Sequence, residues 1–289
     1  MKLRPFVLVL AATSALGVSG SALAACFDWS TPAVSDVVDS GKPDATPGDT
    51  GAVPDAEPGG PDAELPTCGP PITPPGPPSL HLTLDDLASL STPLAGSAFG
   101  SVVTGITESD FALGVCNKAL HFKAGLHLSY PEVPPEAGDA GVPNISYAQG
   151  TVMMWYRPDY PEGDIVERAI LRTSGVINRG GIRVSRGKFG GVGFYYWNAA
   201  GVFAGQIESP MKLAQGRWVH IAVSWQAGAA PRIFLNGVLD VSVNAVVIDG
   251  AAAKSSASQL VGIGNNPTAA ETPADGLIDD VRFYPTPLP

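Results

Sequence analysis

Three carboxylates, those of Glu162, Asp164 and Glu167, lie within one short segment and could do acid–base chemistry. Retaining glycoside hydrolysis needs two carboxyl groups only about 5–5.5 Å apart, which this spacing on a bulged strand can provide. However, proline and glycine surround the first glutamate and disfavour a central strand, and Arg168 follows as a partner for one of the acids. We therefore expect a turn with no catalytic residue, and keep hydrolysis by the three acids as the alternative.

Aromatic side chains form a second group that could contact a ligand. The run Phe194–Trp197 is aromatic at every position, so on a strand only one of its two faces can join the core. The rings on the other face must meet solvent, a loop or a ligand, and exposed Tyr or Trp rings suit the apolar C–H faces of sugars. We take Tyr195, Trp197, Tyr156 and Arg157 as candidate ligand-binding residues, with core packing as the alternative.

Short strands separated by turns must position these side chains. From Leu80 onwards the chain has about 210 residues, enough for one sizeable core. It shows alternating hydrophobic patterns and no convincing amphipathic helix. The expected strands include residues 80–84, 151–157, 181–185, 218–225, 232–235 and 238–243. The dipeptide Asn236-Gly237 between the last two predicts a tight hairpin. Such a pattern predicts an antiparallel sandwich or barrel.

Four blocks along the chain together carry a resemblance to a known family. They are Leu80-x-Leu-x-Leu-Asp85; Ala119–Phe122 followed by Thr151–Trp155; Gly216–Val223 followed by Phe234–Gly237; and Gly262–Gly264 followed by Gly276–Tyr284. In this order they resemble the laminin-G-like jelly roll of the concanavalin A-like lectin and glucanase superfamily.

The resemblance implies an all-β fold, an antiparallel jelly-roll β-sandwich over residues 80–289. This fold carries lectins, adhesive modules and glycosidases alike, so the sites and not the fold must decide the function. The spacing of Glu162, Asp164 and Glu167 matches that of laminarinase-type glucanases of the same superfamily. Binding is nevertheless favoured over catalysis, because the only acid constellation lies in a turn context.

The resemblance also places Asp85, Asp279 and Asp280 in strands that flank one another. Calcium prefers carboxylate and carbonyl oxygens, so one structural calcium ion could bind these acids. Asp279 shares strand parity with Val281 and so could face inward, where a carboxylate needs a partner. A hydrogen bond from a buried donor, such as His220 or the backbone, is the alternative to the cation.

The N-terminus predicts export. Residues 1–25 have a basic start, an apolar run over residues 6–18 that is too short to span a bilayer, and then Leu23-Ala24-Ala25-Cys26. This last segment resembles the bacterial lipobox, in which cleavage before a lipidated cysteine anchors the protein, so Cys26 is the expected lipidation site. An ordinary secretory signal is the alternative. Phe27 follows in place of an aspartate, which favours the outer membrane or cell surface over the inner membrane.

Cysteine usage fits this compartment. The chain has 3 cysteines, so lipidation of Cys26 leaves Cys68 and Cys116. Disulfides persist in oxidising compartments, and an even remainder after export predicts that these two are paired. Two separate thiols are the alternative.

Residues 26–79 are almost entirely Pro, Gly, Ala, Asp and Thr. A segment of this composition cannot bury enough apolar surface to offset its ordering entropy, so we expect a disordered tether. The net charge of −10 disfavours nucleic acid as a partner and disfavours direct adsorption to anionic lipid. Contact with the membrane is therefore expected through the lipid anchor alone.

The sequence thus predicts an exported lipoprotein with one β domain on a long tether. The expected partner is a glycan, or a glycosylated or other surface protein. A protein-docking or adhesion module without a sugar site is the alternative, and a glycoside hydrolase is the least favoured.

Overall fold

The computed structural model describes residues 66–133, 143–174, 181–198, 200–242, 258–265 and 272–289. The signal segment, Cys26 and the expected tether up to residue 65 lie outside the described residues, so these expectations stay predictions. Within the described part of the chain, no helix is long and apolar enough to cross a membrane.

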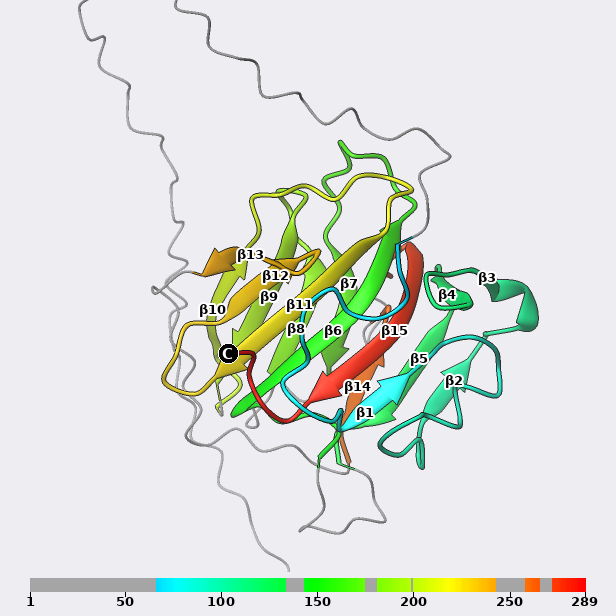
Figure 1. The fold of residues 1–289 in the computed structure, drawn as a ribbon, viewed down its shortest axis with the longest axis horizontal. Helices are drawn as coiled ribbons and strands as arrows, with labels where there is room; N and C mark the ends of the chain where they lie inside the picture. The colour runs from blue at the N-terminus through cyan, green and yellow to red at the C-terminus, as the bar shows by residue number, and fades with distance from the viewer. Residues whose placement is uncertain (1–65, 134–142, 175–180, 199, 243–257, 266–271) are drawn as a thin grey trace, which may run out of the picture. The chain divides into compact units, whose positions relative to one another are not determined.

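Two antiparallel sheets pack face to face, which confirms the predicted all-β sandwich (Figure 1). Sheet A contains, in spatial order, β13 (Val238–Ser242), β12 (Arg232–Leu235), β11 (Val219–Gln226), β6 (Gln149–Pro158), β15 (Gly276–Tyr284), β4 (Lys118–Phe122) and β3 (Phe111–Leu113), with β1 (Leu80–Leu82) also paired to β15. Sheet B contains β10 (Phe203–Glu208), β9 (Val192–Trp197), β8 (Gly181–Arg186), β7 (Arg168–Thr173), β14 (Leu260–Ile263), β5 (His127–Pro131) and β2 (Val102–Thr104). A single 3-10 turn, η1 (Glu108–Asp110), precedes β3 among the described residues.

Strand alternation builds the core between the sheets. On β6, Val152, Met154 and Tyr156 are fully buried in the main apolar cluster. Their neighbours Met153 and Trp155 have the opposite parity and lie on the outer face of sheet A, where Met153 joins a second, smaller cluster. Each large apolar side chain buried in this way stabilises the fold by about 1.5–3 kcal/mol.

The predicted hairpin is also present. Asn236 and Gly237 connect β12 to β13 with φ values of 50° and 83°. Two successive left-handed residues are typical of the type I′ turn that matches the twist of paired strands.

Residues 66–79, here called the strap, correct the expected extent of the tether. Although their composition predicts disorder, they lie against the outer face of sheet A. Cys68 forms a disulfide with Cys116 (S–S 2.07 Å), and the Trp155 indole donates a hydrogen bond to the Gly69 carbonyl at 3.2 Å. Ile72 packs on the smaller apolar cluster. The strap is thus part of the folded domain, because long-range contacts supply what its composition does not.

The C-terminal tail covers another part of the same face. The Leu288 backbone N–H donates to the Ser224 hydroxyl at 2.9 Å, and the Arg232 guanidinium donates to the Leu288 and Pro289 carbonyls. The Leu288 side chain belongs to the smaller cluster. The strap and the tail therefore both cover the outer face of sheet A.

Candidate functional site

The three acids of the possible catalytic motif lie in the loop between β6 and β7. Asp164 pairs with Arg168, and Glu167 Oε1 lies 3.1 Å from Arg183 Nη1. Glu162 is exposed to solvent. The segment is a turn, as the sequence predicted, and two of its acids are each held by a different arginine. This arrangement lacks the bulged strand on which the hydrolase alternative depends.

Two arginines fasten this loop to the domain. Arg168 and Arg186 stack on the Tyr160 ring, with guanidinium carbons 4.7 and 5.3 Å from its centroid. Arg186 Nη1 also donates to the Val166 carbonyl at 3.0 Å. The hydrogen bond from Arg168 holds the pKa of Asp164 below its usual value. The backbone on the N-terminal side of Glu167 is therefore fixed on the sheet.

Strand β9 presents aromatic rings on both faces, as its sequence predicted. Phe194 and Tyr196 are buried in the main core, which leaves Tyr195 and Trp197 on the outer face of sheet B. The Trp197 ring meets Phe203 of the adjacent strand β10 edge to face, with centroids 5.8 Å apart. Phe203 is 50% exposed. These two rings form a partly exposed apolar surface at the end of the β9–β10 hairpin.

Two arginines from neighbouring strands stack on this row of rings. Arg172 of β7 lies over Trp197, and Arg183 of β8 lies over Tyr195, at 5.5 and 5.3 Å from the ring centroids. We call Arg172, Arg183, Tyr195, Trp197 and Phe203 the aromatic–arginine face. It offers flat apolar surface beside fixed hydrogen-bond donors, which is the usual composition of a small-molecule site.

Tyr195 has a different role in this face from the one expected. Its side chain is only 8% exposed, and burial together with a hydrogen bond to Glu167 raises the pKa of its hydroxyl. Arg183 lies over its ring. Tyr195 therefore supports Arg183 from below, and the ring available to a ligand is that of Trp197.

The other two candidate ligand residues lie elsewhere. Tyr156 is fully buried, and its hydroxyl donates to the Ala274 carbonyl, so the expectation that it contacts a ligand is wrong. Arg157 follows with opposite parity on the outer face of sheet A, where it stacks over Trp218 at 5.7 Å and lies 3.8 Å from Asp159. The two residues neither share a face with each other nor join Trp197, because β6 and β9 belong to different sheets.

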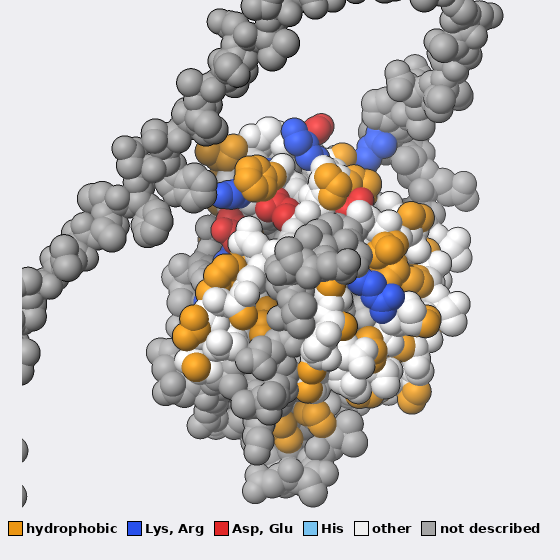
Figure 2. All heavy atoms as spheres, turned by 90° about the vertical axis from the view of Figure 1, so that its left-hand side faces the viewer, with side chains coloured by type: hydrophobic (Ala, Val, Ile, Leu, Met, Phe, Trp, Pro, Cys, Tyr) orange, Lys and Arg blue, Asp and Glu red, His pale blue; other side chains and the backbone are white. Residues whose placement is uncertain are grey.

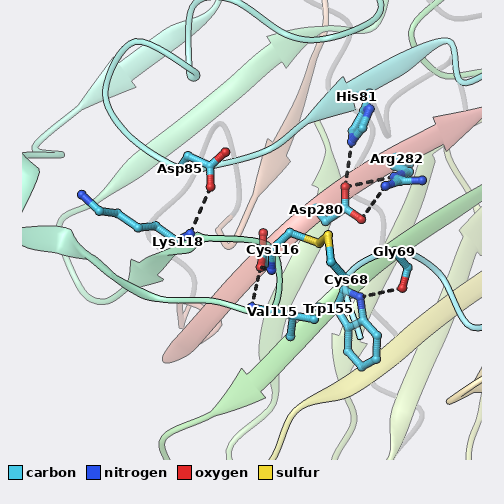
Figure 3. Close-up of a disulfide and its surroundings, with 11 residues drawn as sticks. Cys68, Gly69, His81, Asp85, Val115, Cys116, Lys118, Trp155, Asp280 and Arg282 are labelled. Carbon is cyan, nitrogen blue, oxygen red and sulfur yellow. Dashed lines mark hydrogen bonds and ion pairs between the residues drawn. A yellow bond between two sulfur atoms is a disulfide. The ribbon is translucent and has the colours of Figure 1, made fainter. Parts of the chain in front are cut away.

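Two of the proposed calcium ligands, Asp85 and Asp280, lie near the Cys68–Cys116 disulfide in Figure 3, and Asp279 bonds to the backbone of Cys116. Asp280 pairs with His81 at 2.7 Å and with Arg282 at 2.8 Å. Asp85 accepts a hydrogen bond from the Lys118 backbone N–H at 3.0 Å.

Asp279 is fully buried, and its Oδ2 accepts the N–H groups of Val115 and Cys116 at 2.8 and 2.7 Å. Burial raises its pKa to about 7. Burial likewise lowers the pKa of the nearby His220 to about 4.

The expected calcium ion stays a prediction, because each of its three candidate ligands has protein partners. Asp85, Asp279 and Asp280 each bind different protein groups, although Oδ1 of Asp279 has no hydrogen-bond partner. Within the described ranges, no group of three or more His, Cys, Asp or Glu side chains is placed to hold a metal ion. Backbone N–H donors supply the partner that the sequence required for Asp279.

Sequence reasoning missed three members of the aromatic–arginine face, namely Phe203, Arg172 and Arg183. A signal for Phe203 was present, because the short loop through Gly201 places it opposite Trp197 across a hairpin. The arginines come from β7 and β8, so their approach to the rings depends on strand order in sheet B. One surface hollow lies elsewhere, lined by Ser224, Trp225, Gln226, Ala229, Ala230, Arg232 and Pro287, and contains no candidate site residue predicted from the sequence.

Comparisons with known proteins agree with the architecture. Residues 137–289, more than half of the chain, match a family model described as the concanavalin A-like lectin/glucanases superfamily. Domain 4 of AbnA, a GH43 extracellular arabinanase from Geobacillus stearothermophilus solved with arabinotriose, is 19% identical with a TM-score of 0.53, covering 73% of this chain and 94% of that one. The receptor-binding domain of botulinum neurotoxin C/D mosaic serotype is 13% identical with a TM-score of 0.53, covering 73% of this chain and 48% of that one. At these identities the likeness is one of fold. No curated protein sequence matches the chain.

Proposed function

The chain belongs to the concanavalin A-like lectin/glucanases superfamily, and from this premise we propose that it is an exported, lipid-anchored protein whose β-sandwich binds a glycan. The observation that carries the proposal is the partly exposed Trp197–Phe203 pair, flanked by stacked arginines on the outer face of sheet B. The ligand is a free glycan or the glycan of a surface protein.

The aromatic–arginine face suits a sugar for two reasons. The rings of Trp197 and Phe203 meet the apolar C–H face of a pyranose or furanose ring, while guanidinium groups donate hydrogen bonds to its hydroxyls. A solved domain of the same fold contains arabinotriose, which supports carbohydrate as the ligand class. Binding without hydrolysis is favoured because Asp164 and Glu167 are each paired with an arginine.

The part of the proposal that concerns export and anchoring rests on the sequence alone. Residues 1–25 direct export, Cys26 carries the lipid, and the Pro- and Gly-rich stretch up to residue 65 separates the anchor from the domain. Where such a stretch is extended, it reaches on the order of 100 Å. We place the protein at the outer membrane or cell surface, in contact with the membrane only through its anchor.

A glycan array with the full chain in detergent, run with calcium and with chelator, tests the proposed binding. We expect Trp197→Ala to lower the affinity for the bound glycan at least tenfold, because the stacking surface is lost. Trp218→Ala on the outer face of sheet A is the matched control and should leave the affinity unchanged. Loss of binding under chelator would show that glycan binding depends on a divalent cation.

Two outcomes would contradict the glycan proposal. An array on which the wild type binds nothing would favour the protein-docking alternative, and full binding by Trp197→Ala would move the site to another surface.

The anchor has its own test. Cys26→Ser should move the protein from the membrane pellet to the soluble fraction after detergent-free lysis, since the lipid has no other attachment point. Retention of the variant in the washed pellet would contradict lipidation at this residue.

A further inference from the structure

The cation of Arg183 is neutralised by the protein itself. Glu167 Oε1 lies 3.1 Å from its Nη1, and the arginine side chain is 14% exposed against 36% for the glutamate. The glutamate is thus the more accessible partner of the ion pair. Tyr195 supports both groups, because its ring lies under the guanidinium and its hydroxyl bonds to Glu167.

The ion pair is built into the fold. Arg183 is held in the middle of β8, between its neighbours β7 and β9. Glu167 is held by its loop, in which Asp164 pairs with Arg168 and the Val166 carbonyl accepts a hydrogen bond from Arg186. A second carboxylate, that of Glu208, lies close enough to raise the pKa of the Tyr195 hydroxyl further. Glu167 therefore stays beside Arg183 without any ligand.

This arrangement bears on the class of sugar that can bind. A planar guanidinium is the best side-chain partner for a carboxylate, because two parallel N–H groups match its two oxygens. At Arg183 a carboxylate of the chain already takes that role, and Glu208 adds a second negative charge nearby. To bind at Arg183, a carboxylated sugar would have to displace Glu167 or lie beside two like charges. A neutral sugar can instead donate a hydroxyl to Glu167 and accept from an arginine.

We propose that Glu167 is a specificity-determining residue, which neutralises Arg183 so that the aromatic–arginine face binds neutral, hydroxyl-rich glycans and rejects carboxylated ones. The inference rests on the proposed glycan-binding function and deepens it. The acidic segment between β6 and β7 then determines which sugars bind at the site and has no catalytic role.

Matched oligosaccharides give the sharpest test. The full chain is titrated with pairs that differ only at C6, namely gluco-, galacto- and manno-oligosaccharides and their uronic acid counterparts of equal length and linkage. We expect the wild type to bind a neutral member at least tenfold more tightly than its acidic counterpart. Glu167→Gln should raise the affinity for the acidic member at least tenfold, and this gained binding should weaken with added salt.

Two further variants control the experiment. Glu162→Gln removes an exposed acid from the same loop and should leave the preference unchanged. Glu167→Ala removes the whole side chain and should gain acidic binding as Glu167→Gln does, and thermal unfolding identifies which of the two variants to use if one is unstable.

The outcomes separate this inference from the function on which it rests. A wild type that binds acidic and neutral members equally, or Glu167 variants that are folded and still reject uronic acids, would overturn the selectivity role while leaving glycan binding intact. A wild type that binds no member of any pair, and no glycan on the array, would overturn the proposed function itself.

Discussion

The outer faces of the two sheets differ in what covers them and in how they hold charge. On sheet A, the strap and the C-terminal tail lie over Met153 and its apolar neighbours, and Asp279 beside them is fully buried. On sheet B, Trp197 and Phe203 remain partly exposed, and the nearby carboxylate of Glu167 keeps an ion pair within reach of solvent. The buried carboxylate of Asp279 on the first face thus contrasts with the partly exposed carboxylate of Glu167 on the second.

From this contrast we expect sheet A to contribute mainly to stability and sheet B mainly to binding. A face that buries apolar surface and charged groups under chain segments contributes to folding stability, and substitutions there change the free energy of unfolding. A face that keeps stacked rings accessible can bind a ligand at little cost to the fold, as we propose for sheet B. Substitutions on sheet A should therefore change the free energy of unfolding and leave binding unchanged, whereas substitutions on sheet B should do the reverse.

Figure 2 views the edge where β10 and β13 end the two sheets, and there hydrophobic side chains lie among charged ones.

The largest expected effect comes from opening the strap. The Cys68–Cys116 bond closes a loop with a sequence separation of 48, so its removal should cost about 4 kcal/mol of unfolding free energy by release of unfolded-state entropy. Denaturant unfolding of wild type and of Cys68→Ser/Cys116→Ser measures the change.

Glycan affinity of this double variant, measured under conditions where it is still folded, should equal that of the wild type. If the double variant were as stable as the wild type, or were folded but no longer bound glycan, the assignment of stability to sheet A and of binding to sheet B would be wrong.

Asp279 should give the next largest effect, and it depends on pH. Its folded-state pKa of about 7 lies above the usual 3.8, so the stability that it contributes is fully present below about pH 4 and is lost as the pH rises through 7. Asp279→Asn keeps the acceptor for the Val115 and Cys116 N–H groups and removes the buried charge. We expect this variant to be about 4 kcal/mol more stable than the wild type at pH 8 and similar to it at pH 4, by denaturant unfolding across pH. A constant difference at every pH would contradict the buried charge.

His220 should act with the opposite sign. Its folded-state pKa of about 4 lies below the usual 6.5. The protein therefore loses stability as the pH falls from about 6.5 to 4, because His220 takes up a proton in the unfolded chain but stays neutral where it is buried. His220→Gln should reduce the loss of stability between pH 7 and pH 4 by about 3 kcal/mol, although it also removes the edge-to-face contact with Trp155 at 5.1 Å. For each protein the unfolding free energy at pH 4 is therefore compared with its own value at pH 7, so that the pH-independent cost of losing the Trp155 contact cancels. If the variant lost as much unfolding free energy between pH 7 and pH 4 as the wild type does, a group other than His220 would cause the loss.

Local patterns predicted the architecture, the cysteine count predicted the disulfide, and long-range contacts decided the rest. The Asn236-Gly237 turn and the period-two strands follow from their own residues, and parity on β6 already groups Tyr156 with the buried Val152. The strap was missed because its composition is that of a disordered segment, and only contacts with sheet A order it. Arg183 was missed because its position over Tyr195 follows from strand pairing and not from spacing along the chain.

The smallest expected change in stability is the one that sharpens the comparison most. Trp197→Ala removes a partly exposed ring whose contacts are with Phe203 and Arg172 on the surface of sheet B. Because this ring lies outside the main apolar cluster, we expect a loss of about 1 kcal/mol or less in unfolding free energy, alongside the tenfold loss of glycan affinity. Ile72→Ala on sheet A is the counterpart, since it should lower stability by about 1–2 kcal/mol and leave affinity unchanged. If Trp197→Ala lowered the unfolding free energy more than Ile72→Ala did, the main role of the Trp197 ring would be to stabilise the fold. The aromatic–arginine face would then not be the binding surface.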